Sequence, residues 1–255
     1  MLNEKKPSAS LRRSAGEVKR YRVYTRVIPA VMGVILALMA LVYVISLLFN
    51  RYGSFTVTVR DFNDRNYMLS LCENDRFNTA TSMLNSKAAK NITNISRTSL
   101  PENLNDVNGE HNGDNYVAYT FYLKNTGTAS YSYDYTLNIS RATLNIDSAV
   151  RVRLYFTPDY YKAETDQINY GGAYTEYAKP KTNGNGLPET EIDGTVMTNF
   201  VSSEVITNGR VDNFNPGDMA KITVVIWIEG DDPDCTDDLL GGQFKVDMIM
   251  SIVSE

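Results

Sequence analysis

The residues best suited to chemistry lie in one acidic segment near the C-terminus. Residues 231–238 hold five aspartates and Cys235, and two glycines follow directly after Leu240. Carboxylate oxygens are the ligands that Ca²⁺ prefers in proteins. One interpretation is therefore a calcium site, although the spacing differs from that of an EF-hand loop. Its ligands would come from four side chains, Asp231, Asp234, Asp237 and Asp238. No other cofactor is expected.

The same segment also has an explanation without a metal ion. Thirteen residues, 230–242, separate two predicted strands, whereas an ordinary hairpin loop has about two to five. Asp232 suits a helix N-cap, Pro233 suits the first helical position, and Gly241 and Gly242 suit the exit. This pattern predicts a single helical turn, with the aspartates organising the loop rather than performing chemistry.

The chain has two cysteines, Cys72 and Cys235. Both fall in the part of the chain that we expect to be exported, where a pair of cysteines commonly forms a disulfide. The alternative is two separate buried thiols that pack as small apolar side chains.

Catalytic chemistry has little support in the sequence. His111 is the only histidine, which excludes a His-Glu-x-x-His zinc site, and it lies in a loop rich in glycine and asparagine. The chain has no Gly-x-Ser-x-Gly elbow and no glycine-rich phosphate loop. We therefore expect no enzymatic activity. We interpret the glycosylation-type motifs at Asn91, Asn94 and Asn138 as chance matches.

Five tyrosines gather in one predicted insertion: Tyr160, Tyr161, Tyr170, Tyr174 and Tyr177. Exposed tyrosines can anchor a protein or peptide partner or stack on a sugar. In a sheet protein they also often cover the core. Both interpretations stay open, with a peptide or protein partner expected ahead of a sugar.

An apolar segment sets the topology in which these residues must be positioned. Residues 27–49 form a run of 23 residues without a charged side chain. As a helix this run would be about 34 Å long, which predicts a transmembrane helix. No pair of small residues follows it at the spacing that signal peptidase needs, so we expect a retained anchor.

The charges on either side of this segment differ in sign. Residues 1–26 carry eight basic and two acidic side chains, a net +6, and the whole chain carries −5, which leaves −11 for the remainder. Positive segments stay in the cytoplasm. The pattern predicts a cytoplasmic tail at residues 1–26, a single-pass membrane protein and an extracellular domain at residues 50–255. Its acidic charge also argues against nucleic acid as a partner.

The extracellular part has the alternating pattern of β-strands. Apolar and polar residues alternate near 55–59, 117–123, 131–139, 150–156, 222–228 and 244–252. We expect a mainly β fold, an antiparallel two-sheet sandwich of the jelly-roll or Ig-like type. Segments 117–123 and 131–139 should form a hairpin, and Arg151 and Arg153 should face water. Insertions at about 61–115, with a short helix near 79–89, and at about 157–200 should cover the ends of the sandwich.

Three motifs in this order resemble the TasA and camelysin-type extracellular proteins of Gram-positive bacteria. They are the apolar helix before Ser54-Phe-Thr-Val-Thr-Val59, the segment from Asn115 to Lys124-Asn-Thr-Gly127, and Asn215-Pro-Gly-Asp218. The resemblance implies a jelly-roll domain exported to the cell surface, which in the best-known members builds biofilm matrix fibres. The metallopeptidase label sometimes given to camelysin-like proteins does not transfer, because His111 stands alone.

Two functional classes follow from these observations. The first is a membrane-tethered structural or interaction protein that takes part in, or anchors, a cell-surface or biofilm matrix assembly. Its partner would be an extracellular protein or further copies of the same chain. The alternative is a surface module that binds a glycan or peptide through the tyrosine-rich insertion or a calcium-ordered acidic loop.

Overall fold

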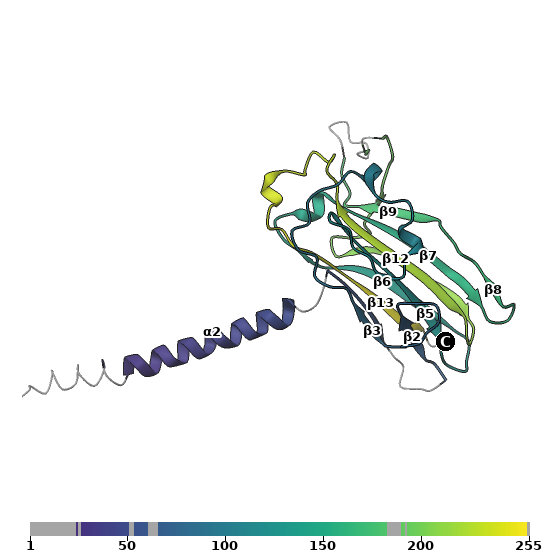
Figure 1. Cartoon of the computed structure of the whole chain (residues 1–255), viewed down its shortest axis with the longest axis horizontal. Coiled ribbons are helices and arrows are strands. Elements are labelled where there is room, and N and C mark those ends of the chain that lie inside the picture. The colour runs from purple at the N-terminus through teal and green to yellow at the C-terminus, as the bar shows by residue number, and fades with distance from the viewer. Residues whose placement is uncertain are drawn as a thin grey trace, which may run out of the picture. The chain divides into compact units, whose positions relative to one another are not determined.

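The computed structural model describes residues 24, 27–50, 54–60, 66–182, 190, 191 and 193–253 (Figure 1). The chain divides into two compact units, Met1–Asn50 and Arg51–Glu255. Apart from Tyr24, the basic tail predicted at residues 1–26 lies outside the described residues.

The described part of the first unit contains the helix α2 (Ile28–Asn50), of 23 residues. Its only proline, Pro29, lies in the first turn, where a missing N–H breaks no helical hydrogen bond. Side chains along α2 are described as far as residue 44 and are exposed. Among the residues with described side chains, no helix is both long and apolar enough to span a bilayer.

The second unit is mainly β and contains two sheets, as the sequence predicts. Sheet A has the strand order β11-β6-β13-β1-β3. Its strands are β1 (Phe55–Arg60), β3 (Met83–Asn85), β6 (Tyr131–Ala142), β11 (Val205–Phe214) and β13 (Phe244–Val253).

Sheet B has the order β10-β9-β7-β12-β5-β2, with β4 paired to β5 and β8 paired to β7. Its strands are β2 (Leu69–Cys72), β4 (Gly109–Glu110), β5 (Tyr116–Asn125), β7 (Val150–Lys162), β8 (Gln167–Ile168), β9 (Tyr174–Ala178), β10 (Thr198–Asn199) and β12 (Met219–Ile228). The described residues of this unit also form four short 3₁₀ turns: η2 (Arg97–Ser99), η3 (Leu104–Asp106), η4 (Ile146–Ser148) and η5 (Asp237–Leu239).

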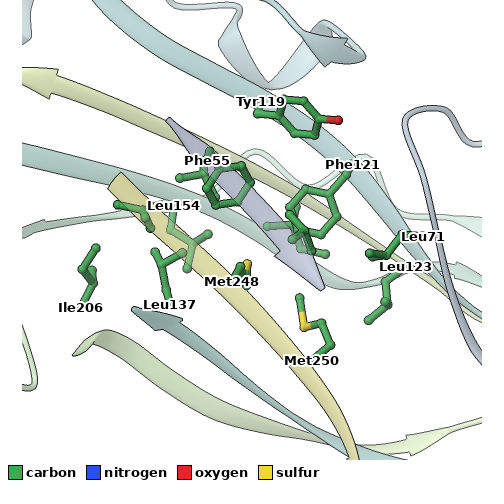
Figure 2. Close-up of a cluster of buried hydrophobic side chains, with 14 of the residues drawn as sticks. Phe55, Leu71, Tyr119, Phe121, Leu123, Leu137, Leu154, Ile206, Met248 and Met250 are labelled. Carbon is green, nitrogen blue, oxygen red and sulfur yellow. The ribbon is translucent and has the colours of Figure 1, made fainter. Parts of the chain in front are cut away.

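The two sheets pack face to face through one apolar core. Alternate residues of each strand point inward, so that Phe55 of sheet A meets Tyr119 of sheet B with ring centroids 5.8 Å apart. Figure 2 shows Phe55, Phe121 and Met248 among the side chains of this core. The predicted alternation of apolar and polar residues therefore arises because both sheets bury one face in the same core.

The sheets are not antiparallel throughout, which corrects the predicted sandwich. β1 runs parallel to β13, with Phe55 opposite Val246, and β10 runs parallel to β9. Parallel neighbours need a long connection, and both pairs have one. β1 and β13 stand at opposite ends of the unit, and 19 residues, 179–197, separate β9 from β10. Alternation of apolar residues carries no information on strand direction.

The predicted hairpin of segments 117–123 and 131–139 is also wrong. The corresponding strands, β5 and β6, belong to different sheets, and the turn between them crosses the core edge from sheet B to sheet A. Each strand has one apolar face, and two strands that face the same core from opposite sides have the same pattern as hairpin partners. β12 and β13 are divided in the same way, so the long acidic loop between them joins two sheets.

The first insertion covers the outer face of sheet B, where the sequence suggests only an end of the sandwich. Leu100 and Leu104 pack there against Val225 and Trp227, and β12 is consequently buried on both faces over almost its whole length. Within this insertion, the segment expected to be helical contains the strand β3. Sheet B therefore lies between the core and a segment of this insertion, residues 95–111, which we call the cover segment or cover.

Candidate functional site

Two arginines that were expected to face water lie at the centre of a buried ion-pair network. Arg151 and Arg153 point to the outer face of sheet B, opposite Val150 and Val152, and are only 5% and 6% exposed. Both side chains do point away from the core, as the alternation predicts, but the outer face of the sheet is covered. A buried charge needs a partner, because desolvation is otherwise very unfavourable.

Arg153 and Arg97 share the carboxylate of Glu176 on β9. Arg153 Nε donates to Glu176 Oε1 at 2.7 Å, and Arg97 Nε donates to Glu176 Oε2 at 2.6 Å. Arg97 also pairs with Asp193. The guanidinium of Arg153 lies 4.5 Å from the ring centre of Tyr174, a cation–π contact. These contacts bind the cover segment and the tyrosine-rich insertion to sheet B.

Arg151 forms the second half of the network with the acidic loop. Its Nε donates to Glu191 at 2.6 Å, and its Nη2 donates to Asp232 at 2.5 Å. Lys181 Nζ lies 2.7 Å from Asp232 and 2.9 Å from Asp234. Asp232 is buried and is thus neutralised by two cations from different segments.

The pKa values of the two acids that pair with Arg151, Asp232 and Glu191, shift in opposite directions. Burial would raise the pKa of Asp232, but hydrogen bonds from Lys181, the Asp234 N–H and Arg151 outweigh burial and lower it. Burial raises the pKa of Glu191 despite its hydrogen bond from Arg151. The network therefore holds Asp232 as a carboxylate while making Glu191 easier to protonate.

The acidic loop forms no helix at Pro233, where the helical turn was predicted, but it contains a different short turn four residues later. The turn is the 3₁₀ helix η5, which begins at Asp237 after an N-cap at Thr236. Asp232, the predicted N-cap, instead closes a tight turn by accepting from the Asp234 N–H at 2.7 Å. This difference follows from tertiary contacts that the sequence does not show. Arg151 and Lys181 hold the Asp232 side chain against sheet B.

The four candidate calcium ligands do not converge on one point. Asp231 accepts from Ser96 at 2.5 Å, Asp234 pairs with Lys181, and Asp237 and Asp238 lie exposed in η5. Over the described ranges of the chain, no three histidine, cysteine or acidic side chains are placed to hold a metal ion.

A small pocket lies beside the network. Its volume is about 40 Å³, and Arg151, Lys181, Glu191 and Asp232 are among its lining residues. A drug-sized ligand needs roughly 300 Å³ or more, whereas a single water needs about 10–15 Å³. The pocket therefore suits a few waters.

The predicted disulfide between Cys72 and Cys235 is not formed, and both residues are free thiols. Cys72 lies level with Tyr122, which faces Lys221 near the start of β12. Cys235 follows the far end of β12, where Asn94 Nδ2 donates to its sulfur at 3.3 Å. The strand between those levels rises by about 23 Å at roughly 3.3 Å per residue, far beyond the reach of a disulfide.

The five tyrosines do not form one surface. Tyr160 is buried against Tyr122, with ring centroids 5.1 Å apart, and Tyr177 packs against the main core. Tyr161 is half-buried and donates to Asp166 at 2.9 Å. Tyr170 and Tyr174 are exposed, at 72% and 46%. Two of the five are therefore available to a partner.

His111 holds the cover segment in place. Its two ring nitrogens each lie 2.9 Å from a main-chain oxygen, those of Gly109 and Leu104. These contacts position the loop ahead of β5 and the turn η3 against sheet B.

The two turn motifs Lys124-Asn-Thr-Gly127 and Asn215-Pro-Gly-Asp218 lie against each other. The Asn125 N–H donates to the main-chain oxygen of Asp218 at 3.1 Å, and the Gly217 N–H donates to the main-chain oxygen of Asn125 at 2.9 Å. Asn125 Nδ2 also donates to the Phe214 oxygen at 2.8 Å. The buried carboxylate of Asp218 in turn binds Lys162 at 2.7 Å. One polar cluster thus joins β5, β11, β12 and β7.

The site that emerges is a set of charges that fix loops to a sheet. Comparisons with protein-family models, with curated proteins and with solved structures find no match for this chain.

Proposed function

We propose that the protein is a membrane-tethered extracellular structural or interaction protein that takes part in, or anchors, a cell-surface or biofilm matrix assembly. One observation supports this most strongly. The helix α2 is apolar on every side, and its described side chains are exposed. A helix of this kind is stable only when buried in a bilayer or a large core. Its 23 residues would reach about 34 Å.

We further propose a jelly-roll relationship with the TasA and camelysin-type proteins. The long strands after β4 alternate between the sheets, with β5, β7 and β12 in sheet B and β6, β11 and β13 in sheet A. Such crossing between sheets is typical of double-sheet jelly rolls, whereas Ig-like sandwiches keep more neighbouring strands in one sheet. The parallel entry of β1 is a departure from that pattern.

An edge of sheet A suits assembly. β11 is ten residues long and, among the described strands, pairs with β6 alone. An edge strand presents backbone donors and acceptors to another chain. β11 carries Arg210 and Asp212, and its pairing has irregularities near both ends. The charges and irregularities limit unspecific strand pairing, and they favour a partner whose charges are complementary to Arg210 and Asp212.

The exposed Tyr170 and Tyr174 support the second class, a module that binds a peptide or glycan. A simple experiment on purified full-length protein distinguishes the two functional classes. Filaments, or addition to a matrix fibre without a small ligand, support the assembly function. A protein that stays monomeric and binds glycans or peptides through Tyr170 and Tyr174 supports the module.

Membrane topology is tested with protease on intact cells that express the chain with an N-terminal epitope. We expect the β unit to be digested and the epitope to survive, because the proposed tail is cytoplasmic. Permeabilised cells serve as the control and should lose the epitope as well. Recovery of a soluble, N-terminally trimmed β unit from the medium as the main form would contradict the retained anchor.

A further inference from the structure

The outer face of sheet B buries a lysine without a carboxylate partner. Lys221 on β12 is 7% exposed, and within the described residues it forms no salt bridge. Its Nζ donates instead to the main-chain oxygen of Asn105 at 2.5 Å. A buried amine of this kind is easier to deprotonate, and burial lowers the pKa of Lys221 although the charges of Asp106 and Asp75 oppose the shift.

The side chain of the same asparagine is held in a fixed orientation. Asn105 is 7% exposed, and its Oδ1 accepts from Thr223 Oγ1 at 2.9 Å. Thr223 is in turn 2.7 Å from Thr120 on the neighbouring strand. A hydroxyl that donates to a carboxamide oxygen stabilises the negative charge that develops there when a nucleophile attacks the carbon.

Lys221 and Thr223 lie two residues apart on β12, so they present a nucleophile and a hydrogen-bond donor to one asparagine. The ring of Tyr160 lies 5.9 Å from Lys221 Nζ and helps to exclude water. The geometry points to an intramolecular isopeptide bond between Lys221 Nζ and Asn105 Cγ.

The reaction needs no external reactant. The neutral amine attacks Asn105 Cγ, the Nζ–Cγ bond forms and the Cγ–Nδ2 bond breaks. One amine proton moves to Nδ2, and ammonia leaves. No atom is oxidised or reduced, and the release of ammonia from a closed site makes the step effectively irreversible. Holding the two groups together replaces a slow bimolecular reaction by an intramolecular one.

The bond would connect η3 in the cover segment to the central strand of sheet B across 116 residues of sequence. Such a link would keep the cover on the sheet under mechanical load, which suits a surface protein but does not depend on the proposed function.

The test is the mass of the full-length chain, purified in detergent and measured after denaturation. We expect a mass lower than that of the sequence by one ammonia, and a branched tryptic peptide that joins the segments around Asn105 and Lys221. The variants Lys221→Arg and Asn105→Ala should lose both signatures. Lys124→Arg, on the neighbouring strand β5, should keep them.

The wild-type protein alone can overturn the inference, whatever the variants do to folding. Linear peptides around Asn105 and Lys221 would overturn it. A loss of ammonia with linear peptides would also do so, because it would indicate a succinimide at one of the Asn-Gly pairs.

Discussion

Asp232 shows how a single side chain can decide the conformation of a loop. Its carboxylate receives Arg151 from β7 and Lys181 from the segment after β9, and it closes the turn at Asp234. The aspartate therefore joins three segments that are distant in sequence. Removing one member of a buried ion pair leaves the others uncompensated.

The variant Asp232→Asn should lower the free energy of unfolding by about 3 kcal/mol or more, because Arg151 and Lys181 stay buried without their charge partner. Urea unfolding measures this loss. The matched control is Asp134→Asn, which removes the exposed partner of Arg210 and should change stability little. Equal effects of the two variants would contradict the structural role of Asp232.

The same variant should also change the dependence of stability on pH. The pKa of Asp232 is lowered from 3.8, so its contribution is present above pH 3.8 and is lost as the pH falls through the lowered value. Glu191 acts in the opposite sense, because its raised pKa favours the folded state below pH 4.5. The difference between wild type and Asp232→Asn should therefore shrink on acidification.

At the scale of elements, the cover over sheet B is the feature that distinguishes this unit from a simple two-layer sandwich. Leu104 in η3 packs on the outer face of strands β5, β7 and β12 in a cluster with Trp227. The side chains of this cluster are apolar, so burial of the outer face is driven by the hydrophobic effect as well as by the ion pairs.

Shortening an apolar side chain of the cover should change the fluorescence of Trp227, the single tryptophan of the chain. We expect Leu104→Ala to cost about 2–5 kcal/mol and to shift Trp227 fluorescence to longer wavelength as water reaches the indole. Leu144→Ala, at an exposed position, is the control and should do neither. An unchanged spectrum in Leu104→Ala would show that the cover does not shield Trp227.

At the scale of the whole molecule, the two free thiols report on different regions. Cys72 is buried in β2, whereas Cys235 is half-buried in the acidic loop. In the native protein without reductant, a thiol reagent should label Cys235 first and Cys72 only after unfolding. Complete labelling of both in unfolded, unreduced protein would confirm free thiols. Labelling that appears only after reduction would show that they pair.

The sequence by itself determined the mainly β class, the approximate positions of the long strands and the apolar helix, because periodicity and run length are local properties. It also located the acidic loop between two strands. It could not assign those strands to sheets, because a strand with one apolar face has the same alternating pattern in either of two sheets that share a core. Tertiary structure alone decided that β5 and β6 are not a hairpin and that β1 lies parallel to β13. Nor could alternation reveal that the outward face of β7 is covered, which is why it predicts solvent exposure for Arg151 and Arg153, although both are buried. Their buried partners, Glu176, Glu191 and Asp232, come from segments far along the chain, and only the folded structure brings these charges together.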